Sequence, residues 1–353
     1  MDRIYPKIPK IELHAHLSGS VSHTTLRRLQ NFGDGTVPVS LPTLDGIDKS
    51  NIHECFALFK VVHQTLQSPA VVEQATTDVI EEFAEDGVVY LELRTTLRPL
   101  PTRRDYLDAV IRGINSASSR SNGRIDVRLL SSIDRTLGLD VALEVVDLTI
   151  EYKNRWPGLI LGVDLSGNPD FGTLLDFVPA LERARAHGIK TTVHLAELPN
   201  QGREWFEFLT VHMPDRIGHG TFLSNSGGIT DPYASKARSL IQQARIPIEI
   251  CLTSNVKTET VADYRSHHLL YWLQLGHPVC ICTDDKGVFS CTLSSELKQA
   301  VNLCGVSMSQ LYQMTAWSID AAFCSEADKR KMHEQLTAFQ AENPEIFTKI
   351  SEV

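Results

Sequence analysis

Two histidines stand two residues apart in the stretch IELHAHLSGS, which covers residues 11–20. Side chains two positions apart on an extended strand point to the same face of the sheet. His14 and His16 could therefore occupy two neighbouring positions around one metal ion. A partly buried pair of histidines without a metal is the alternative interpretation, and the motif alone does not exclude it.

Two more polar residues with metal-binding chemistry follow apolar stretches elsewhere in the chain. His194 lies in IKTTVHLAE, and Asp284 lies in HPVCICTDD. Three imidazoles and one carboxylate, without a thiolate, are typical of a catalytic metal with water at an open position, and zinc suits this set best. The sequence therefore predicts one zinc ion per chain, with the ligands His14, His16, His194 and Asp284.

Hydrolysis at a zinc ion also needs groups that move protons, because the metal supplies only the activated water. Glu197 follows a predicted ligand at a strand end, where partial burial could raise its pKa. His219, in RIGHGT, could hold or deprotonate the water, or could be a structural histidine in a tight turn. Asp285 could hydrogen-bond a substrate, or could support the ligand beside it.

These residues need a fold that brings distant strand ends together. Continuous apolar, β-branched stretches are typical of parallel strands that are buried on both faces. Eight of them occur, at residues 11–16, 88–94, 126–134, 159–167, 189–197, 215–220, 246–255 and 277–285. Helical patterns fill most of the gaps, for example at residues 70–86, 104–118, 140–153, 173–187 and 234–244.

This alternation predicts an α/β fold, and eight strands favour a (β/α)8 TIM barrel of the metal-dependent hydrolase type over an open sheet. Most of the predicted strands end in His, Asp, Glu or Arg, and in such a barrel these ends share the rim that holds active sites. Extra helices are expected near residues 22–31 and 51–67, an irregular loop at 31–50, and more helices at 305–340. We expect one domain over residues 1–353.

Composition and charge restrict the class of protein. The net charge of −9 argues against general nucleic-acid binding, which requires a basic face. No apolar run approaches the roughly 18 residues that a membrane span needs, and MDRIYPKIPK is too short and polar for a signal peptide. Seven cysteines without a CxxC pair indicate reduced, mostly buried thiols. We expect a cytoplasmic monomer whose partner is a small molecule, without nucleic acid or membrane.

Several motifs, in this order, resemble the adenosine/AMP deaminase family of zinc-dependent barrels. They are PKIELHAHLSGS, DLSGNP, HLAELPN, DRIGHGTFL, EICLTSNV and ICTDDKGVF, and the resemblance extends from about residue 6 to residue 325. Within the family the chain looks closest to the adenosine deaminase-like branch, which acts on N6-methyl-AMP. ECFALFKVVHQ and EFAEDGVVYLELRTT support this narrower match. The base deaminases that act on nucleic acids use a different zinc signature, which does not occur here.

The resemblance implies a role for each residue of the site. His14, His16, His194 and Asp284 would bind zinc, and Glu197 would protonate N1 of the purine. His219 and Asp284 would handle the hydroxide that attacks C6. Asp285 would bond N7, and the Gly167 N–H would meet N3.

The substrate end of the site suggests a nucleotide. Adenosine deaminases carry aspartate where this chain has Ser18, and a carboxylate about 4 Å from a phosphate would cost on the order of 1–4 kcal/mol. The stretch RTTLR supplies hydroxyls and guanidinium groups that suit phosphate, although the family usually has proline in place of Leu97. Arg94 and Arg98 are both candidates for the main phosphate contact, and structural salt bridges are their alternative. The predicted substrate-binding residues are His16, Ser18, His63, Thr95, Thr96, Leu97, Arg98, Asp134, Gly167 and Asp285.

The sequence thus predicts a zinc-dependent purine nucleotide aminohydrolase that converts N6-methyl-AMP to IMP and methylamine. Three alternatives stay open: an adenosine deaminase that acts on the free nucleoside, another barrel hydrolase with two metals, and a catalytically inactive barrel that binds nucleotides. DLSG at the end of the fourth strand lacks the lysine that two-metal members often carry there, so one metal is expected.

Overall fold

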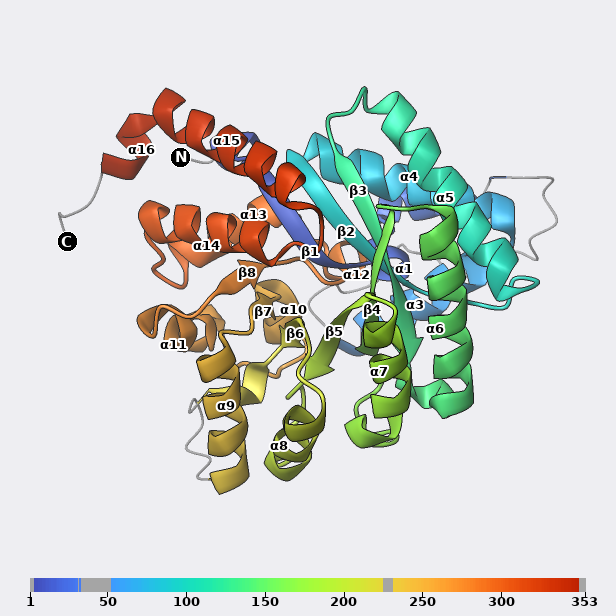
Figure 1. Ribbon diagram of the computed structural model, residues 1–353. Coiled ribbons are helices and arrows are strands. Elements are labelled where there is room, and N and C mark those ends of the chain that lie inside the picture. The colour runs from blue at the N-terminus through green and yellow to red at the C-terminus, as the bar shows by residue number, and fades with distance from the viewer. Residues whose placement is uncertain (1–2, 31, 33–51, 225–230, 349–353) are drawn as a thin grey trace.

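Eight parallel strands follow one another in chain order around a barrel in the computed structural model, which describes residues 3–30, 32, 52–224 and 231–348. The His16 N–H donates to the Asp284 carbonyl at 3.0 Å and the Asp284 N–H to the His14 carbonyl at 2.8 Å, so the segment after the last strand closes on the first. The predicted (β/α)8 TIM barrel is confirmed (Figure 1). The strands are β1 Lys10–His16, β2 Val88–Thr96, β3 Asp126–Asp134, β4 Ile160–Ser166, β5 Lys190–Leu195, β6 Arg216–His219, β7 Ile248–Ile250 and β8 Val279–Ile281.

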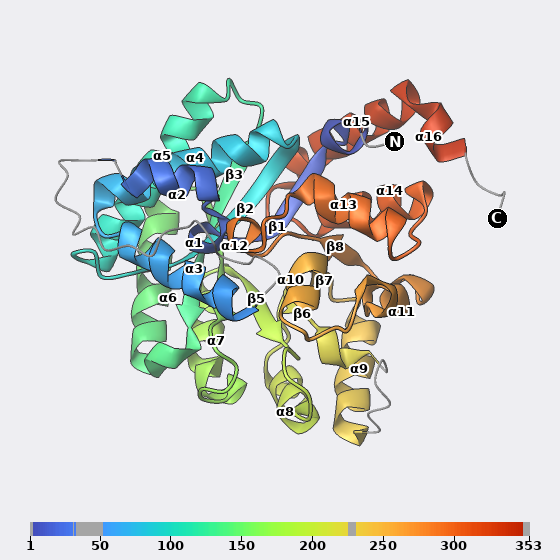
Figure 2. The ribbon, with the colours of Figure 1, turned by 180° about the vertical axis from the view of Figure 1, so that it is seen from behind.

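Helices cover the outside of the barrel, as the two opposite views of the ribbon show (Figures 1 and 2). Neighbouring residues cap the first turns of two of these helices. The Ser68 side chain, just before Pro69, accepts from the Val71 N–H, and Thr102 and Asp105 form a capping box. The helices between strands are α4 Pro69–Glu85, α5 Arg103–Arg120, α6 Gly138–Arg155, α7 Val178–Ala186, α8 Gly202–Val211, α9 Pro232–Ala244, α10 Leu252–Lys257 and α11 Leu269–Gln274.

The remaining α-helices lie between β1 and α4 and after β8, where extra helices were predicted. The first group is α1 Leu17–Ser20, α2 His23–Gln30 and α3 Ile52–Thr65, and the second is α12 Lys286–Phe289, α13 Leu293–Asn302, α14 Met308–Ala321, α15 Glu326–Glu342 and α16 Pro344–Thr348. The predicted loop at 31–50 lies outside the described residues, apart from Phe32. No helix in the described ranges is long and apolar enough to cross a membrane.

One predicted strand is wrong in its second half. Only Ile248–Ile250 of the expected strand 246–255 is extended, and α10 begins at Leu252. The carboxylate of Glu296 on α13 accepts from the Thr253 N–H at 2.9 Å, so the first turn of α10 has a partner for a free N–H group. This partner comes from a distant helix, which a local pattern does not report.

The barrel interior contains charged side chains as well as apolar ones. Six of them are completely buried: Glu12, Glu92, Arg94, Asp164, Arg216 and Glu249. Buried charges are stable only when they are paired or hydrogen-bonded. The thiols are also buried, as predicted, for the six cysteines whose side chains are described: Cys251, Cys280, Cys282, Cys291, Cys304 and Cys324.

Candidate active site and metal centre

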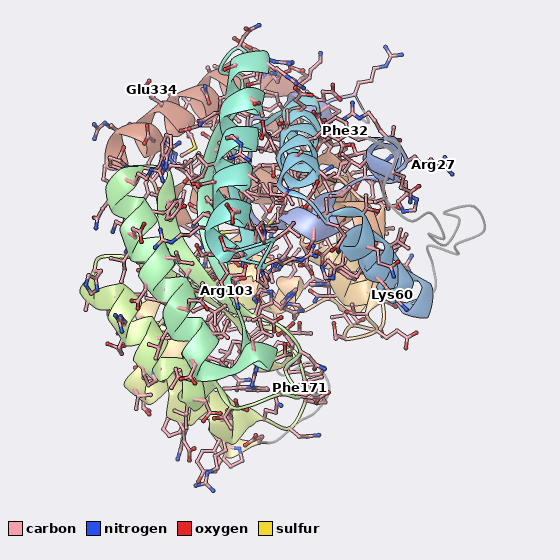
Figure 3. All side chains as sticks on the ribbon, turned by 90° about the vertical axis from the view of Figure 1, so that its right-hand side faces the viewer. Arg27, Phe32, Lys60, Arg103, Phe171 and Glu334 are labelled. Carbon is pink, nitrogen blue, oxygen red and sulfur yellow. The ribbon has the colours of Figure 1, made fainter. Side chains whose placement is uncertain are left out.

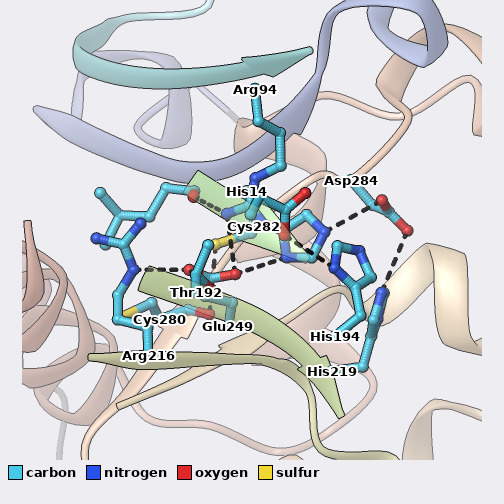
Figure 4. Close-up of polar contacts among 12 residues, drawn as sticks. His14, Arg94, Thr192, His194, Arg216, His219, Glu249, Cys280, Cys282 and Asp284 are labelled. Carbon is cyan, nitrogen blue, oxygen red and sulfur yellow. Dashed lines mark hydrogen bonds and ion pairs between the residues drawn. The ribbon is translucent and has the colours of Figure 1, made fainter. Parts of the chain in front are cut away.

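The four predicted metal ligands meet at the C-terminal rim of the barrel. His14 and His16 come from β1, His194 from β5, and Asp284 from the segment after β8, three residues beyond its end at Ile281. One ligand atom from each of these residues lies within 4.8 Å of the others. The His16 and His194 Nε2 atoms are 3.3 Å apart, and His14 Nε2 is 3.4 Å from Asp284 Oδ1. The fold therefore brings the four ligands to one point, and Figure 4 shows three of them, His14, His194 and Asp284, side by side.

A metal ion fits this set of donors. The Nε2 atom of His14 is buried and has no hydrogen-bond partner, although it points into the cluster. A buried polar atom without a partner is costly unless something else binds it. A second group, formed by Cys251, His219 and Asp284, is also close enough to hold a metal. Burial raises the pKa of the Cys251 thiol well above its usual value, which disfavours the thiolate that a metal would need.

Three of the ligands make hydrogen bonds with buried carboxylates or a hydroxyl on the side away from the metal position. Glu249 Oε2 accepts from His14 Nδ1 at 2.8 Å, and Asp164 Oδ1 accepts from His194 Nδ1 at 3.0 Å. With the proton on Nδ1, each ring turns the lone pair of Nε2 towards the metal position. Ser254 donates to Asp284 Oδ2 at 2.7 Å, which leaves Oδ1 on the side of the histidines.

The two supporting carboxylates remain ionised despite burial. Burial alone would raise the pKa of Glu249, but Arg94 and Arg216 outweigh it and hold that pKa well below its usual value. Burial also opposes ionisation of Asp164, and Arg94 and His194 lower the pKa of this group in the same way. Two ionised acceptors thus stand behind two of the ligand rings.

The backbone at the rim adopts a conformation that is unusual for residues other than glycine. Asp284, His219 and Ala196 have φ values of 62°, 61° and 58°. Asp and His tolerate this left-handed region better than most residues, but Ala196 has no polar side chain to compensate for it. Strained backbone of this kind clusters at functional sites. Here Ala196 lies between His194 and Glu197 in the chain.

Glu197 and His219 occupy the positions that acid–base chemistry requires. His219 Nε2 lies 3.7 Å from Glu197 Oε1 and 3.9 Å from Asp284 Oδ2. Burial raises the pKa of Glu197, and it lowers the pKa of His219 well below its usual value. The raised pKa lets Glu197 keep its proton to higher pH than an ordinary carboxyl, and the lowered pKa favours a neutral ring on His219, which suits a proton donor beside a hydrogen-bonding imidazole.

Asp285 lies against the turn after β1. A Cβ atom at position 19 would come within 1.5 Å of Asp285 Oδ1, so glycine is required there. Burial and the adjacent charge of Asp284 raise the pKa of Asp285 well above its usual value. This shift favours the protonated carboxyl of Asp285, which can act as a hydrogen-bond donor.

A cavity of about 550 Å³ opens in front of these groups. It has the size and mixed lining of a small-molecule site. Seven of the predicted substrate-binding residues line it: His16, Ser18, His63, Thr96, Asp134, Gly167 and Asp285. Gly167 has φ +97°, and a Cβ there would meet Asp134 Oδ1 at 2.5 Å, so its N–H can be presented without a side chain in the way.

Three predicted substrate contacts do not line this cavity. Leu97 is completely buried, and the hydroxyl of Thr95 lies 2.7 Å from that of Tyr106. Arg98 Nη1 donates to the Leu66 carbonyl at 3.0 Å, so this guanidinium is attached to the end of α3 beside His63. Alternation along a strand explains Thr95, because its side chain points opposite to that of Thr96.

The role considered for Arg94 as a phosphate contact is wrong. Its side chain is completely buried inside the barrel and pairs with Asp164 and Glu249. Its position in β2, one residue before Thr95, sends it to the interior face of the sheet. The alternative, a structural salt bridge, is the interpretation that the structure supports.

Sequence reasoning missed several residues of the site. Asn255 lines the cavity, and its Nδ2 lies 3.3 Å from His219 Nδ1. Phe59, Leu198 and Phe289 supply apolar lining. Glu249 could have been found from its placement, since a lone carboxylate inside the apolar stretch IPIEIC is unusual for a buried strand unless it has a buried partner.

The sequence profile named adenosine deaminase matches residues 9–339 of the chain. A human protein named N6-methyl-AMP deaminase is 41% identical over 337 residues, which cover 94% of this chain and 93% of the human protein. The apo structure of the N6-methyl-AMP deaminase from Arabidopsis thaliana has a TM-score of 0.83 at 34% identity, and the match covers 98% of this chain and 100% of that chain.

The crystal structure of the Arabidopsis protein ADAL complexed with IMP has a TM-score of 0.83 at 34% identity, with 97% of this chain and 99% of that chain covered. Profile, sequence and fold agree over nearly the whole chain. The chain belongs to the adenosine deaminase family and is a metal-dependent hydrolytic deaminase built on a TIM barrel.

Proposed function

We propose that the chain hydrolyses N6-methyl-AMP to IMP and methylamine with one zinc ion, held by His14, His16, His194 and Asp284. The observation that carries this proposal is the meeting of these ligands with the carboxyl of Glu197 at one cavity. The human relative named for N6-methyl-AMP and the IMP complex of the Arabidopsis relative support a purine monophosphate as the substrate.

Bound zinc would supply the nucleophile, because it lowers the pKa of water towards neutrality. His219 holds the attacking oxygen near C6, and Asn255 fixes the ring of His219 from behind. Glu197 donates a proton to N1 of the purine, which its raised pKa favours at neutral pH. Oxygen adds to C6, the C6–N bond breaks, and the amine departs with a proton. One water molecule is consumed, and IMP and methylamine are formed.

Hydrogen bonds from the chain orient the purine ring. N7 is an acceptor, and the protonated carboxyl of Asp285 donates to it. N3 is an acceptor too, and the N–H of Gly167 donates to it from the other side of the cavity. These donors hold C6 near the reacting oxygen, and such positioning lowers the barrier without any covalent chemistry.

The 5′-phosphate occupies the end of the cavity lined by Ser18, His63 and Thr96. The hydroxyl of Ser18 places no negative charge there, whereas an aspartate about 4 Å from the phosphate would cost on the order of 1–4 kcal/mol. The partial enclosure of His63 by the cavity and the nearby Arg98 lower the pKa of its ring, which favours a hydrogen bond from a neutral imidazole.

A panel of four substrates tests the proposal: N6-methyl-AMP, AMP, N6-methyladenosine and adenosine. Absorbance follows the loss of the 6-amino group, and zinc content is measured on the same sample. We expect the highest kcat/KM for N6-methyl-AMP and one zinc per chain. Preference for a nucleoside over its 5′-monophosphate contradicts the phosphate assignment, and preference for AMP contradicts the assigned N6-methyl group.

A further inference from the structure

One guanidinium lies directly behind the oxygens that orient two metal ligands. Arg94 Nη1 donates to Asp164 Oδ1 at 3.1 Å, and Arg94 Nη2 donates to Glu249 Oε2 at 2.9 Å. These are the same two oxygens that accept from His194 Nδ1 and His14 Nδ1. Each oxygen is thus held between an arginine and a ligand ring.

We propose that Arg94 is a positioning residue that couples the rings of His14 and His194, because its rigid fork fixes the oxygens that hold both rings. The inference concerns the zinc centre of the proposed function and rests on it. A guanidinium offers two donors at a fixed separation and angle. A displacement of either carboxylate is therefore transmitted through Arg94 to the other ligand.

A second buried arginine that contacts Glu249 provides a comparison. Arg216 is also completely buried, and it donates to Glu92 Oε2 and Glu249 Oε1 at 2.6 Å each. It therefore bonds the oxygen of Glu249 that does not hold His14, and none of its hydrogen bonds or ion pairs within the described residues reaches Asp164 or a metal ligand. Loss of Arg216 should weaken the barrel, but it leaves both orienting oxygens with Arg94.

The substitutions Arg94→Lys and Arg216→Lys separate positioning from stability. Lysine keeps the charge but has a single ammonium, so it cannot donate to two fixed oxygens in the same geometry. Zinc affinity is measured by competition with a chromophoric chelator, and the visible spectrum of the cobalt-loaded protein reports ligand geometry. The thermal midpoint of the metal-free protein measures stability independently of the metal.

We expect Arg94→Lys to weaken zinc binding about 10–100-fold, as loss of the groups behind metal ligands commonly does, and to change the cobalt spectrum. Arg216→Lys should lower the metal-free midpoint to a similar extent, with zinc affinity within about threefold of wild type. Equal effects of both variants on zinc affinity, or no effect of Arg94→Lys, would overturn the inference. Absence of zinc binding by the wild-type protein would instead overturn the proposed function, and this inference with it.

A double-mutant cycle keeps the inference testable if Arg94→Lys does not fold. Asp164→Asn and Glu249→Gln each disturb one ligand, and their effects on zinc affinity multiply if the two ligands are independent. Coupling through Arg94 predicts a deviation from the product of more than about threefold. A simple product of the two single effects refutes the coupling.

Discussion

The two ends of the active-site cavity are built differently. At the metal end, side chains come from strands and from the segment that follows β8, and each of His14, His194 and Asp284 has a buried hydrogen-bond partner. At the end where we propose that the phosphate binds, hereafter the phosphate end, Ser18 belongs to a single-turn helix, and His63 lies partly exposed near the end of α3. Figure 3 shows α3, marked by Lys60, at the periphery of the molecule.

The difference indicates where precision matters. Bond making at C6 tolerates little displacement, and ligands on strands with buried support provide a fixed geometry. Recognition of a phosphate dianion depends on local charge and on a few donors, which short helices and loops can supply. Substitutions at the metal end should therefore change kcat, while substitutions at the phosphate end should change KM and substrate choice.

The largest effect is expected at the metal end, from Glu197→Gln. The amide keeps the shape of the side chain but cannot donate an acidic proton to N1, so kcat should fall by roughly 10²–10⁴-fold. Zinc content and the thermal midpoint should stay at the wild-type values, since Glu197 is not among the four ligands. Nearly full activity of this variant would contradict the assignment of Glu197 as the proton donor.

The next effect is expected at the phosphate end, from Ser18→Asp. A carboxylate near the 5′-phosphate should raise KM for N6-methyl-AMP by roughly fivefold to a thousandfold, which corresponds to about 1–4 kcal/mol. N6-methyladenosine should be affected far less, so the ratio of the two kcat/KM values is the measurement. Ser18→Ala is the control without charge, and a similar loss in both variants would show that charge is not the cause.

A smaller effect at the same end is expected from His63→Ala. Loss of one hydrogen bond from a neutral ring should raise KM roughly two- to tenfold with little change in kcat. Lys60→Ala on the same helix is the matched control, because Lys60 is exposed and does not line the cavity. Equal KM values for the two variants would place the phosphate elsewhere.

The smallest effect is a pH dependence that originates at the metal end. Burial raises the pKa of Glu197, and the group acts only when it is protonated. Activity should therefore fall as pH rises through that pKa, by about threefold across the pH unit centred on it. The profile of kcat/KM for the wild-type enzyme tests this, and activity that rises with pH over this range would contradict the assignment.

The metal end was also the more predictable of the two. A barrel sends strand ends to one rim, so His14, His194 and Asp284 could be grouped from pattern alone. The sequence marks Glu249 as a carboxylate within an apolar stretch, but it does not show which ligands Glu249 and Asp164 hold, because those contacts join strands far apart in the chain. Arg94 was misjudged for the same reason: the sequence shows a charge near the rim, but only the register of β2 shows that it points inward.

The phosphate end depends on segments that follow no strand pattern. His63 reaches the cavity because α3 packs near the rim, and no periodicity in the sequence encodes that placement. The helix α10 was likewise missed, since its first turn is stabilised by Glu296 from a later helix. Sequence-based expectations were correct where the barrel topology sets the position of a residue. They failed where a side chain from a distant part of the chain sets the local structure.

The backbone hydrogen bonds between β1 and Asp284 imply a structural role for the metal as well. His14 and His16 lie on one side of this seam and Asp284 on the other, so a single ion would cross-link the first strand to the last. The ion would then hold together an early and a late part of the polypeptide, and chelation would loosen the barrel where its two ends join. The metal ion that takes part in the reaction would therefore also stabilise the closure of the barrel.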